Sequence, residues 1–214
     1  MTEQLLQELQ ELYPFTPCDA PEFDCFDLNG MAFTTKGWEA EGLGRVSRME
    51  ASGMGGAMTM TALIVNPVDI DAPLFNLDLI TLPGKQMLYM ELYDTLLNAP
   101  RNEAPFAAIR ADFGDIPDLP GKPCWYDGIR YSASVTKCAL TGQEGRLKEL
   151  TERFKEAYLD LLKDARLCDP VQKKGKADAY RDGLLAHGGP ATDAFLKAWG
   201  PERTGVLFKK VLFG

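Results

Sequence analysis

The chain has 214 residues, of which 45% are hydrophobic and 25% charged, and this average composition excludes a disordered or fibrous protein. The length fits one folded domain, which we expect to span residues 1–214. The net charge of −8 argues against nucleic acid and anionic membranes as partners.

The cysteine and histidine content bears on redox state, location and metal binding. The five cysteines are widely spaced and form no C-x-x-C pair, so we expect reduced thiols in a cytoplasmic protein. His187 is the only histidine, which excludes a histidine-cluster metal site, and we expect no bound metal. No apolar run approaches the roughly 18 residues of a membrane span, and the first residues carry Glu where a signal peptide carries Lys or Arg.

The first half of the chain predicts one helix followed by strands. Leucines at helical spacing predict an amphipathic helix over residues 2–13, and three prolines make residues 14–27 irregular. A β-hairpin region is expected within residues 32–50. Three apolar, partly alternating runs then predict an antiparallel meander: residues 58–65, Leu74–Leu82 and residues 87–93.

The second half changes from strands to helices. Residues 98–123 are expected to be irregular or briefly helical, and alternation predicts one more strand over residues 128–137. Apolar residues at three- and four-residue intervals predict a long amphipathic helix over residues 144–167. Further helices are expected over residues 178–186, 190–199 and 202–213. Strands followed by helices indicate the α+β class, with an antiparallel sheet covered by helices.

Two features that resemble catalytic motifs are interpreted otherwise. The glycine cluster at residues 53–56 is followed by neither Lys-Ser nor Lys-Thr, and no helix pattern begins there, so it predicts a hairpin turn and not a phosphate-binding loop. His187 lies in a polar, glycine-flanked stretch without a nucleophile motif, which argues against hydrolase chemistry.

Asp78 is the carboxylate whose position is most informative, because it lies in the middle of the apolar run Leu74–Leu82. Aspartate is disfavoured inside a strand, and burial on an inner face would raise its pKa until it could deliver a proton near neutral pH. The alternative is that this face is solvated and Asp78 is an ordinary surface residue. Glu50 and Glu91 are weaker candidates of the same kind.

Two motifs about 120 residues apart carry a resemblance to a known family. Pro73-Leu74-Phe75 is followed by Asp78, and Trp199-Gly200 leads to Val211-Leu212-Phe213. The chain from about residue 44 onward resembles the ferredoxin-dependent bilin reductases, including their phycocyanobilin-forming branch. The resemblance implies a three-layer α/β/α sandwich with a central antiparallel sheet. It also implies a monomer that reduces a linear tetrapyrrole, biliverdin IXα or a close relative, to a phytobilin-type product.

The resemblance further implies how electrons and protons reach the pigment, which would lie between the sheet and the C-terminal helices. Reduced ferredoxin, or flavodoxin, would supply electrons singly, and no bound cofactor is expected. Asp78 falls on the family's proton-donating aspartate. Glu50 aligns either with a family histidine or with a family glutamate, and both alignments stay open. A second family acid is replaced by Gly189, and His187 could substitute for it as a donor.

The remaining expected site residues bind the substrate or the electron donor. Thr61 replaces a family histidine 17 residues before the aspartate, and Asn76 is expected on the face that carries Asp78. Lys137 aligns with a family arginine for a propionate, and Arg48 and Arg130 are further possibilities. An acidic ferredoxin would need a basic surface, for which the C-terminal region offers Lys173, Lys174, Lys176, Arg181, Arg203, Lys209 and Lys210.

Three other functions remain open from the sequence. The first is a relative that binds a bilin or heme without catalysis, because a family histidine and the second family acid are both replaced in this sequence. A reductase of a chlorophyll catabolite would share the fold and the electron source. A plain interaction module would lack a deep cavity lined by polar residues.

Overall fold

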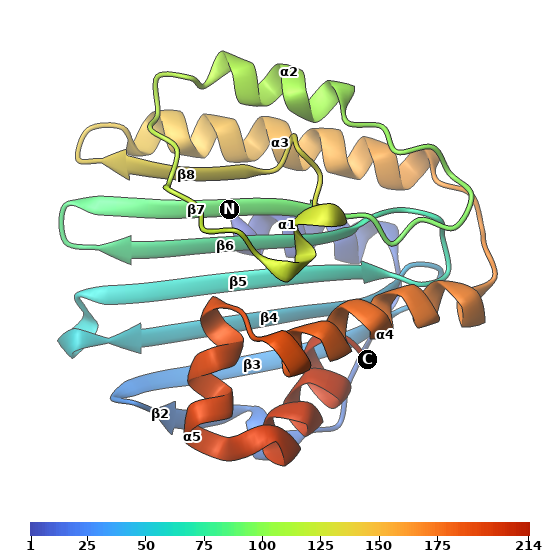
Figure 1. Ribbon diagram of the computed structural model, residues 1–214, viewed down its shortest axis with the longest axis horizontal. Helices are drawn as coiled ribbons and strands as arrows, with labels where there is room; N and C mark the ends of the chain where they lie inside the picture. Colours follow the sequence, from blue (N-terminus) through green and yellow to red (C-terminus); the bar gives the residue numbers. More distant parts are fainter.

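The computed structural model describes the backbone of residues 1–214 and every side chain but that of Pro190. Within this described part, an antiparallel sheet of eight strands lies between two layers of helices (Figure 1). The strands follow one another in the order β1-β3-β4-β5-β6-β7-β8, and β2 pairs with the same strand, β3, as β1 does. The expected α+β class and the three-layer arrangement are confirmed.

The sheet is built mainly from strands that are close neighbours in the sequence. The strands are β1 Phe15–Pro17, β2 Cys25–Leu28, β3 Met31–Ala40, β4 Gly44–Gly53, β5 Met58–Pro67, β6 Leu74–Leu82, β7 Lys85–Tyr93 and β8 Val135–Leu140. A short turn with positive φ at Met54, Gly55 and Gly56 joins β4 to β5, which confirms the hairpin interpretation of the glycine cluster. Two residues, Pro83 and Gly84, join β6 to β7.

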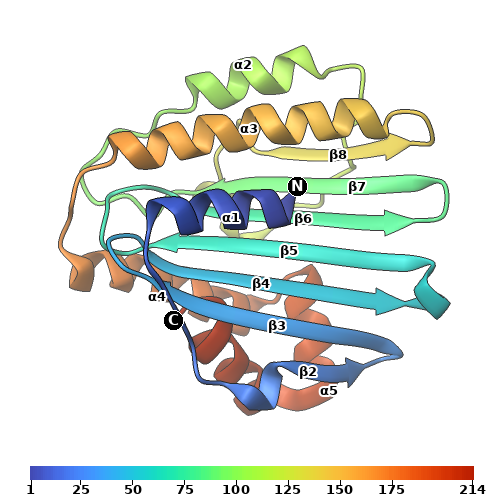
Figure 2. The same cartoon turned by 180° about the vertical axis from the view of Figure 1, so that it is seen from behind.

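Three helices cover one face of the sheet: α1 Thr2–Leu12, α2 Ala104–Asp112 and α3 Glu144–Asp164. Figure 2 shows α1 and α3 lying along the strands on this side. The apolar stripe predicted for α3 is confirmed, because its leucines and aromatic residues are buried in the core beneath it. Strand residues that point to this side, such as Leu77 and Met90, belong to the same core.

The opposite face carries α4 Pro170–His187 and α5 Pro190–Leu207, followed by a π-helical turn at Phe208–Leu212 (Figure 1). The expected helix over residues 178–186 therefore begins much earlier, at Pro170. The two helices expected over residues 190–199 and 202–213 follow each other with a break at Gly200, whose φ is 76°. No helix in the part of the chain that the structure describes is long and apolar enough to cross a membrane.

Two predictions about extended segments need correction. The strand expected over residues 128–137 begins only at Val135, because Trp125–Gly128 forms a 3₁₀ turn and the amide of Ser134 donates to the carbonyl of Tyr131 in another turn. Residues 14–27 were expected to be irregular, but they contain β1 and β2, which pair with successive parts of β3.

Candidate functional site

Strand register decides which side chains accompany Asp78. Asp78 lies opposite Ala62 of β5 and Tyr89 of β7, and Tyr89 lies opposite Thr136 of β8. Side chains directly opposite each other in an antiparallel sheet point to the same face. This face is the one on which α4 and α5 pack, since Ala62 belongs to the same core as residues of both helices.

The face around Asp78 is only half-buried, although it lies on central strands. Asn76, Asp78, Tyr89 and Thr136 are all partly exposed, whereas Leu77, next to Asp78 but pointing to the other face, is 1% exposed. Figure 1 shows that α4 and α5 lie mainly across β2 to β5, whereas the segment between α2 and β8, with the 3₁₀ turn Trp125–Gly128, crosses in front of β6 to β8. The four side chains nevertheless stay partly accessible to solvent.

The Asp78 carboxyl group is in an environment that disfavours its charged form. Burial raises the pKa of Asp78 to about 7, and the negative charge of Glu91 acts in the same direction. The side-chain amide of Asn76 opposes the shift, because its Nδ2 donates a 2.9 Å hydrogen bond to Oδ2 of Asp78. Asp78 therefore exchanges a proton near neutral pH, which is what a general acid requires.

Glu91 is buried on the same face as Asp78. It lies opposite Asn76, in the cross-strand pair next to the pair of Asp78 and Tyr89 on that face. Its Oε1 accepts a hydrogen bond of 2.8 Å from Nη1 of Arg130, and its Oε2 accepts one of 2.7 Å from the hydroxyl of Tyr93. The paired cation compensates the burial of this carboxylate. Arg130 thereby brings a cation to the face that carries Asp78.

Aromatic rings continue from this cluster to the end of α4. The centroids of Tyr93 and Tyr180 are 4.4 Å apart, those of Tyr180 and Trp125 are 5.8 Å apart, and those of Trp125 and His187 are 5.7 Å apart. Trp125 is fixed by a 3.0 Å hydrogen bond from its Nε1 to the carbonyl of Gly188. His187 itself is exposed, so it lies at the outer end of this row of rings.

The structure places four expected site residues on the other face of the sheet: Arg48, Glu50, Thr61 and Lys137. Glu50 lies opposite Thr61, and this cross-strand row continues through Leu79 and Leu88 to Lys137. Leu88 belongs to the core beneath α3, so the row points away from α4 and α5. The expectation that Glu50, Thr61 and Lys137 surround one ligand together with Asp78 is therefore wrong.

The contacts of these residues agree with that placement. Arg48 forms ion pairs with Glu50 and with Glu3 of α1, the helix on the opposite face from Asp78. Lys137 is 2% exposed, and its Nζ donates a 2.8 Å hydrogen bond to the carbonyl of Ile116. The physical reason is the pairing of β5 with β6, which sets Ala62 and not Thr61 opposite Asp78.

Of the expected residues, the structure thus keeps Asp78 and Asn76 in one cluster, with His187 at its edge. Sequence reasoning missed Tyr89, Tyr180 and Trp125, and it ranked Glu91 and Arg130 low. A signal for Tyr89 and Glu91 was present, since a two-residue turn at Pro83-Gly84 requires Asp78 to face Tyr89 and Asn76 to face Glu91.

The expected basic surface is smaller than the sequence indicated. Lys173 is fully buried, where its Nζ donates hydrogen bonds to the carbonyls of Ala72 at 2.6 Å and Thr95 at 2.8 Å, and burial lowers its pKa to about 8. Arg181 is also buried and forms ion pairs with two aspartates of its own helix. The cations that remain exposed are Lys174, Lys176, Arg203, Lys209 and Lys210.

Two cavities, of about 300 and 440 Å³, both lie beside α2, on the face opposite to Asp78, and Asp78 lines neither. Among the described side chains, no group of three or more His, Cys, Asp or Glu is arranged to hold a metal ion.

Comparisons with known proteins give a match at the level of structure. Neither a protein-family model nor a curated protein matches the sequence. The structure is similar to that of phytochromobilin synthase from tomato in complex with biliverdin, with a TM-score of 0.76 and 14% sequence identity. The match covers 99% of this chain and 80% of the tomato chain. The chain therefore has the fold of a bilin reductase, which confirms the fold implied by the sequence resemblance.

Proposed function

We propose that this protein reduces a linear tetrapyrrole of the biliverdin class, with Asp78 as the proton donor. One observation carries the proposal: a half-buried carboxyl group with a pKa near 7 lies mid-strand on the face toward α4 and α5. The similar tomato enzyme was solved with biliverdin bound, which supports a pigment of this class as the ligand.

The sheet around Asp78 offers a surface that suits a flat conjugated molecule. Met60, Ile80, Met87 and Cys138 form the next row on the same face, and all four are half-buried. Thioether and aliphatic groups provide apolar contact without fixing a single shape. Arg130 lies on this face with Glu91, and we assign it, in place of Lys137, to a propionate of the substrate.

The chemistry requires two electrons and two protons for each double bond that is reduced. Each electron added to the conjugated pigment raises its basicity, so a proton must be available at that moment. The protonated carboxyl group of Asp78 transfers its proton to the pigment and becomes a carboxylate, which the hydrogen bond from Asn76 stabilises. Because Asp78 is only half-buried, solvent can supply the proton for the next transfer.

Electrons would come singly from reduced ferredoxin or flavodoxin. The exposed cations of α4, α5 and the π-helical turn support this donor, because ferredoxins are acidic and are attracted to positive charge. The chain as a whole is acidic, so a ferredoxin would be attracted only where such cations are exposed. The absence of a resident cofactor remains a prediction.

Anaerobic incubation of the purified protein with biliverdin, reduced ferredoxin and a regenerating system tests the proposal. We expect the visible spectrum of the bound pigment to pass through radical intermediates to a new product. Asp78→Asn should still bind biliverdin but slow turnover by about a hundredfold or more, because the donated proton is lost. Asp27→Asn, the same chemical change at an exposed position of β2, should leave the rate unchanged.

Other spectral outcomes would replace this proposal. Binding of biliverdin without any change on reduction would indicate a carrier without catalysis. Turnover of a chlorophyll catabolite but not of biliverdin would change the substrate class. If no tetrapyrrole binds, or if Asp78→Asn turns over at the unchanged rate, the proposal is wrong.

A further inference from the structure

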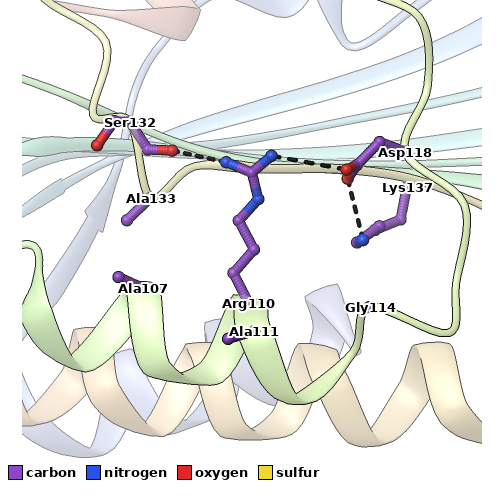
Figure 3. A pocket seen from close by; sticks show the side chains of 8 residues that line it. All are labelled: Ala107, Arg110, Ala111, Gly114, Asp118, Ser132, Ala133 and Lys137. Atoms are coloured by element: carbon purple, nitrogen blue, oxygen red, sulfur yellow. Dashed lines mark hydrogen bonds and ion pairs between the residues drawn. The ribbon is translucent and has the colours of Figure 1, made fainter.

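A second candidate binding site lies on the opposite face from Asp78, between α2 and the segment that leads into β8. It is a shallow pocket of about 300 Å³ that is open to solvent, and four of the residues that line it are small: Ala107, Ala111, Gly114 and Ala133. Figure 3 shows Arg110 extending from α2 toward Asp118 and Ser132, with the Lys137 side chain beside Asp118. The volume is at the lower end of the range for ligand cavities, which limits a ligand to a few carbon atoms.

Two cations converge on this cavity. Nζ of Lys137 forms an ion pair of 3.0 Å with Oδ1 of Asp118, and the Lys137 side chain is almost fully buried. Nη1 of Arg110 donates a 2.7 Å hydrogen bond to the carbonyl of Ser132, and its Nη2 is 3.7 Å from Oδ2 of Asp118. Each oxygen of the Asp118 carboxylate thus faces one cation, Oδ1 facing Lys137 and Oδ2 facing Arg110.

Arg110 keeps hydrogen-bonding capacity that the described residues do not use, whereas Nζ of Lys137 contacts both the carbonyl of Ile116 and Asp118. A guanidinium has five N–H donors, and Arg110 makes one hydrogen bond to the described residues, while the Asp118 oxygen is beyond hydrogen-bond distance from its Nη2. The side chain of Asp118 is 52% exposed, so water competes for its carboxylate. A buried lysine and a half-exposed arginine form a stronger anion site than surface cations do, because water screens them less.

We propose that this cavity binds a small aliphatic carboxylate between Arg110 and Lys137. The carboxylate of Asp118 occupies part of that position and competes with the ligand, while the methyl groups of Ala107, Ala111 and Ala133 contact its carbon chain. The proposal is independent of tetrapyrrole reduction, because the cavity and Asp78 lie on opposite faces of the sheet.

Isothermal titration of the purified full-length protein with succinate tests this site, with propionate as a shorter ligand, succinamide as the uncharged analogue and inorganic phosphate as another anion. We expect succinate to bind and succinamide not to bind. Arg110→Gln should weaken succinate binding about tenfold or more, since a charge-assisted contact is lost. Arg166→Gln, at an exposed arginine away from the cavity, should leave the affinity unchanged.

Asp118→Asn separates a binding site from a structural ion pair. If Asp118 competes with the ligand, this variant should bind succinate about tenfold more tightly, because both cations then lack a carboxylate partner. A purely structural pair would give no gain in affinity. The proposal is overturned if neither the unchanged protein nor folded Asp118→Asn binds a carboxylate, if Arg110→Gln binds as tightly as the unchanged protein, or if phosphate alone binds.

Discussion

At the scale of a single residue, the raised pKa of Asp78 links catalysis to stability. The folded protein holds a proton on this group up to about pH 7, whereas the unfolded chain releases it near pH 3.8. Between these values the folded state binds more protons, so the contribution of Asp78 to stability is complete below pH 3.8 and is lost as the pH rises toward 7. The full shift corresponds to at most about 4 kcal/mol, and partial exposure of Asp78 reduces that figure.

Asp78→Asn should remove this dependence. We expect the variant to lose the fall in its free energy of unfolding between pH 4 and pH 7 and to be more stable than the unchanged protein above pH 7. Urea unfolding of both proteins across this pH range measures the difference. Parallel pH profiles for the two proteins would show that Asp78 titrates in the folded state as it does in water.

At the scale of the elements, part of the site follows from the sequence and part does not. The turn Pro83-Gly84 is short enough to fix the β6–β7 register, so Tyr89 and Glu91 were predictable neighbours of Asp78 and Asn76. The link between β5 and β6 is a longer loop that follows Pro67, and it sets no register by itself. A shift of one residue reverses every side chain of a strand. Thr61 was expected at the site only from its spacing to Asp78 in the resemblance, and this spacing does not determine the face.

The predicted ends of other elements differ from the observed ends for identifiable physical reasons. Asp169 caps α4 by accepting hydrogen bonds from the amides of Val171 and Gln172, but the first turns that follow are polar and lack an apolar stripe. Lys173 occupies a buried position there, which apolar periodicity cannot reveal. Long amphipathic α3 was predictable, because most of its buried positions carry leucine or an aromatic residue at helical spacing.

Substitution of Glu50 tests which residues share a face of the sheet with Asp78. Glu50 points away from Asp78, and its ion pair with Arg48 is at the surface. Glu50→Gln should therefore keep the rate of pigment reduction within about twofold and cost at most about 0.5 kcal/mol of stability. Single-turnover kinetics of Glu50→Gln and of Asp78→Asn, measured side by side, compare the two rates. A loss with Glu50→Gln as large as that with Asp78→Asn would mean that the functional protein pairs β5 and β6 in another register.

At the scale of the whole molecule, charge is distributed unevenly between the layers. The chain carries a net charge of −8, so an acidic electron donor is repelled from most of its surface. Exposed Lys209 lies on the π-helical turn that follows α5, on the layer that would contact the pigment. Lys148 is also exposed but lies on α3, in the layer on the far side of the sheet.

This arrangement predicts which charge reversal affects electron delivery. Lys209→Glu should lower kcat/KM for reduced ferredoxin about tenfold at low ionic strength, and the difference should shrink as salt screens the charges. Lys148→Glu makes the same change in net charge and should have little effect. Reduction by a small uncharged reductant should be equal in both variants, because no charged partner has to dock. Equal losses in the two variants would mean that net charge, and not the layer of α4 and α5, governs the encounter.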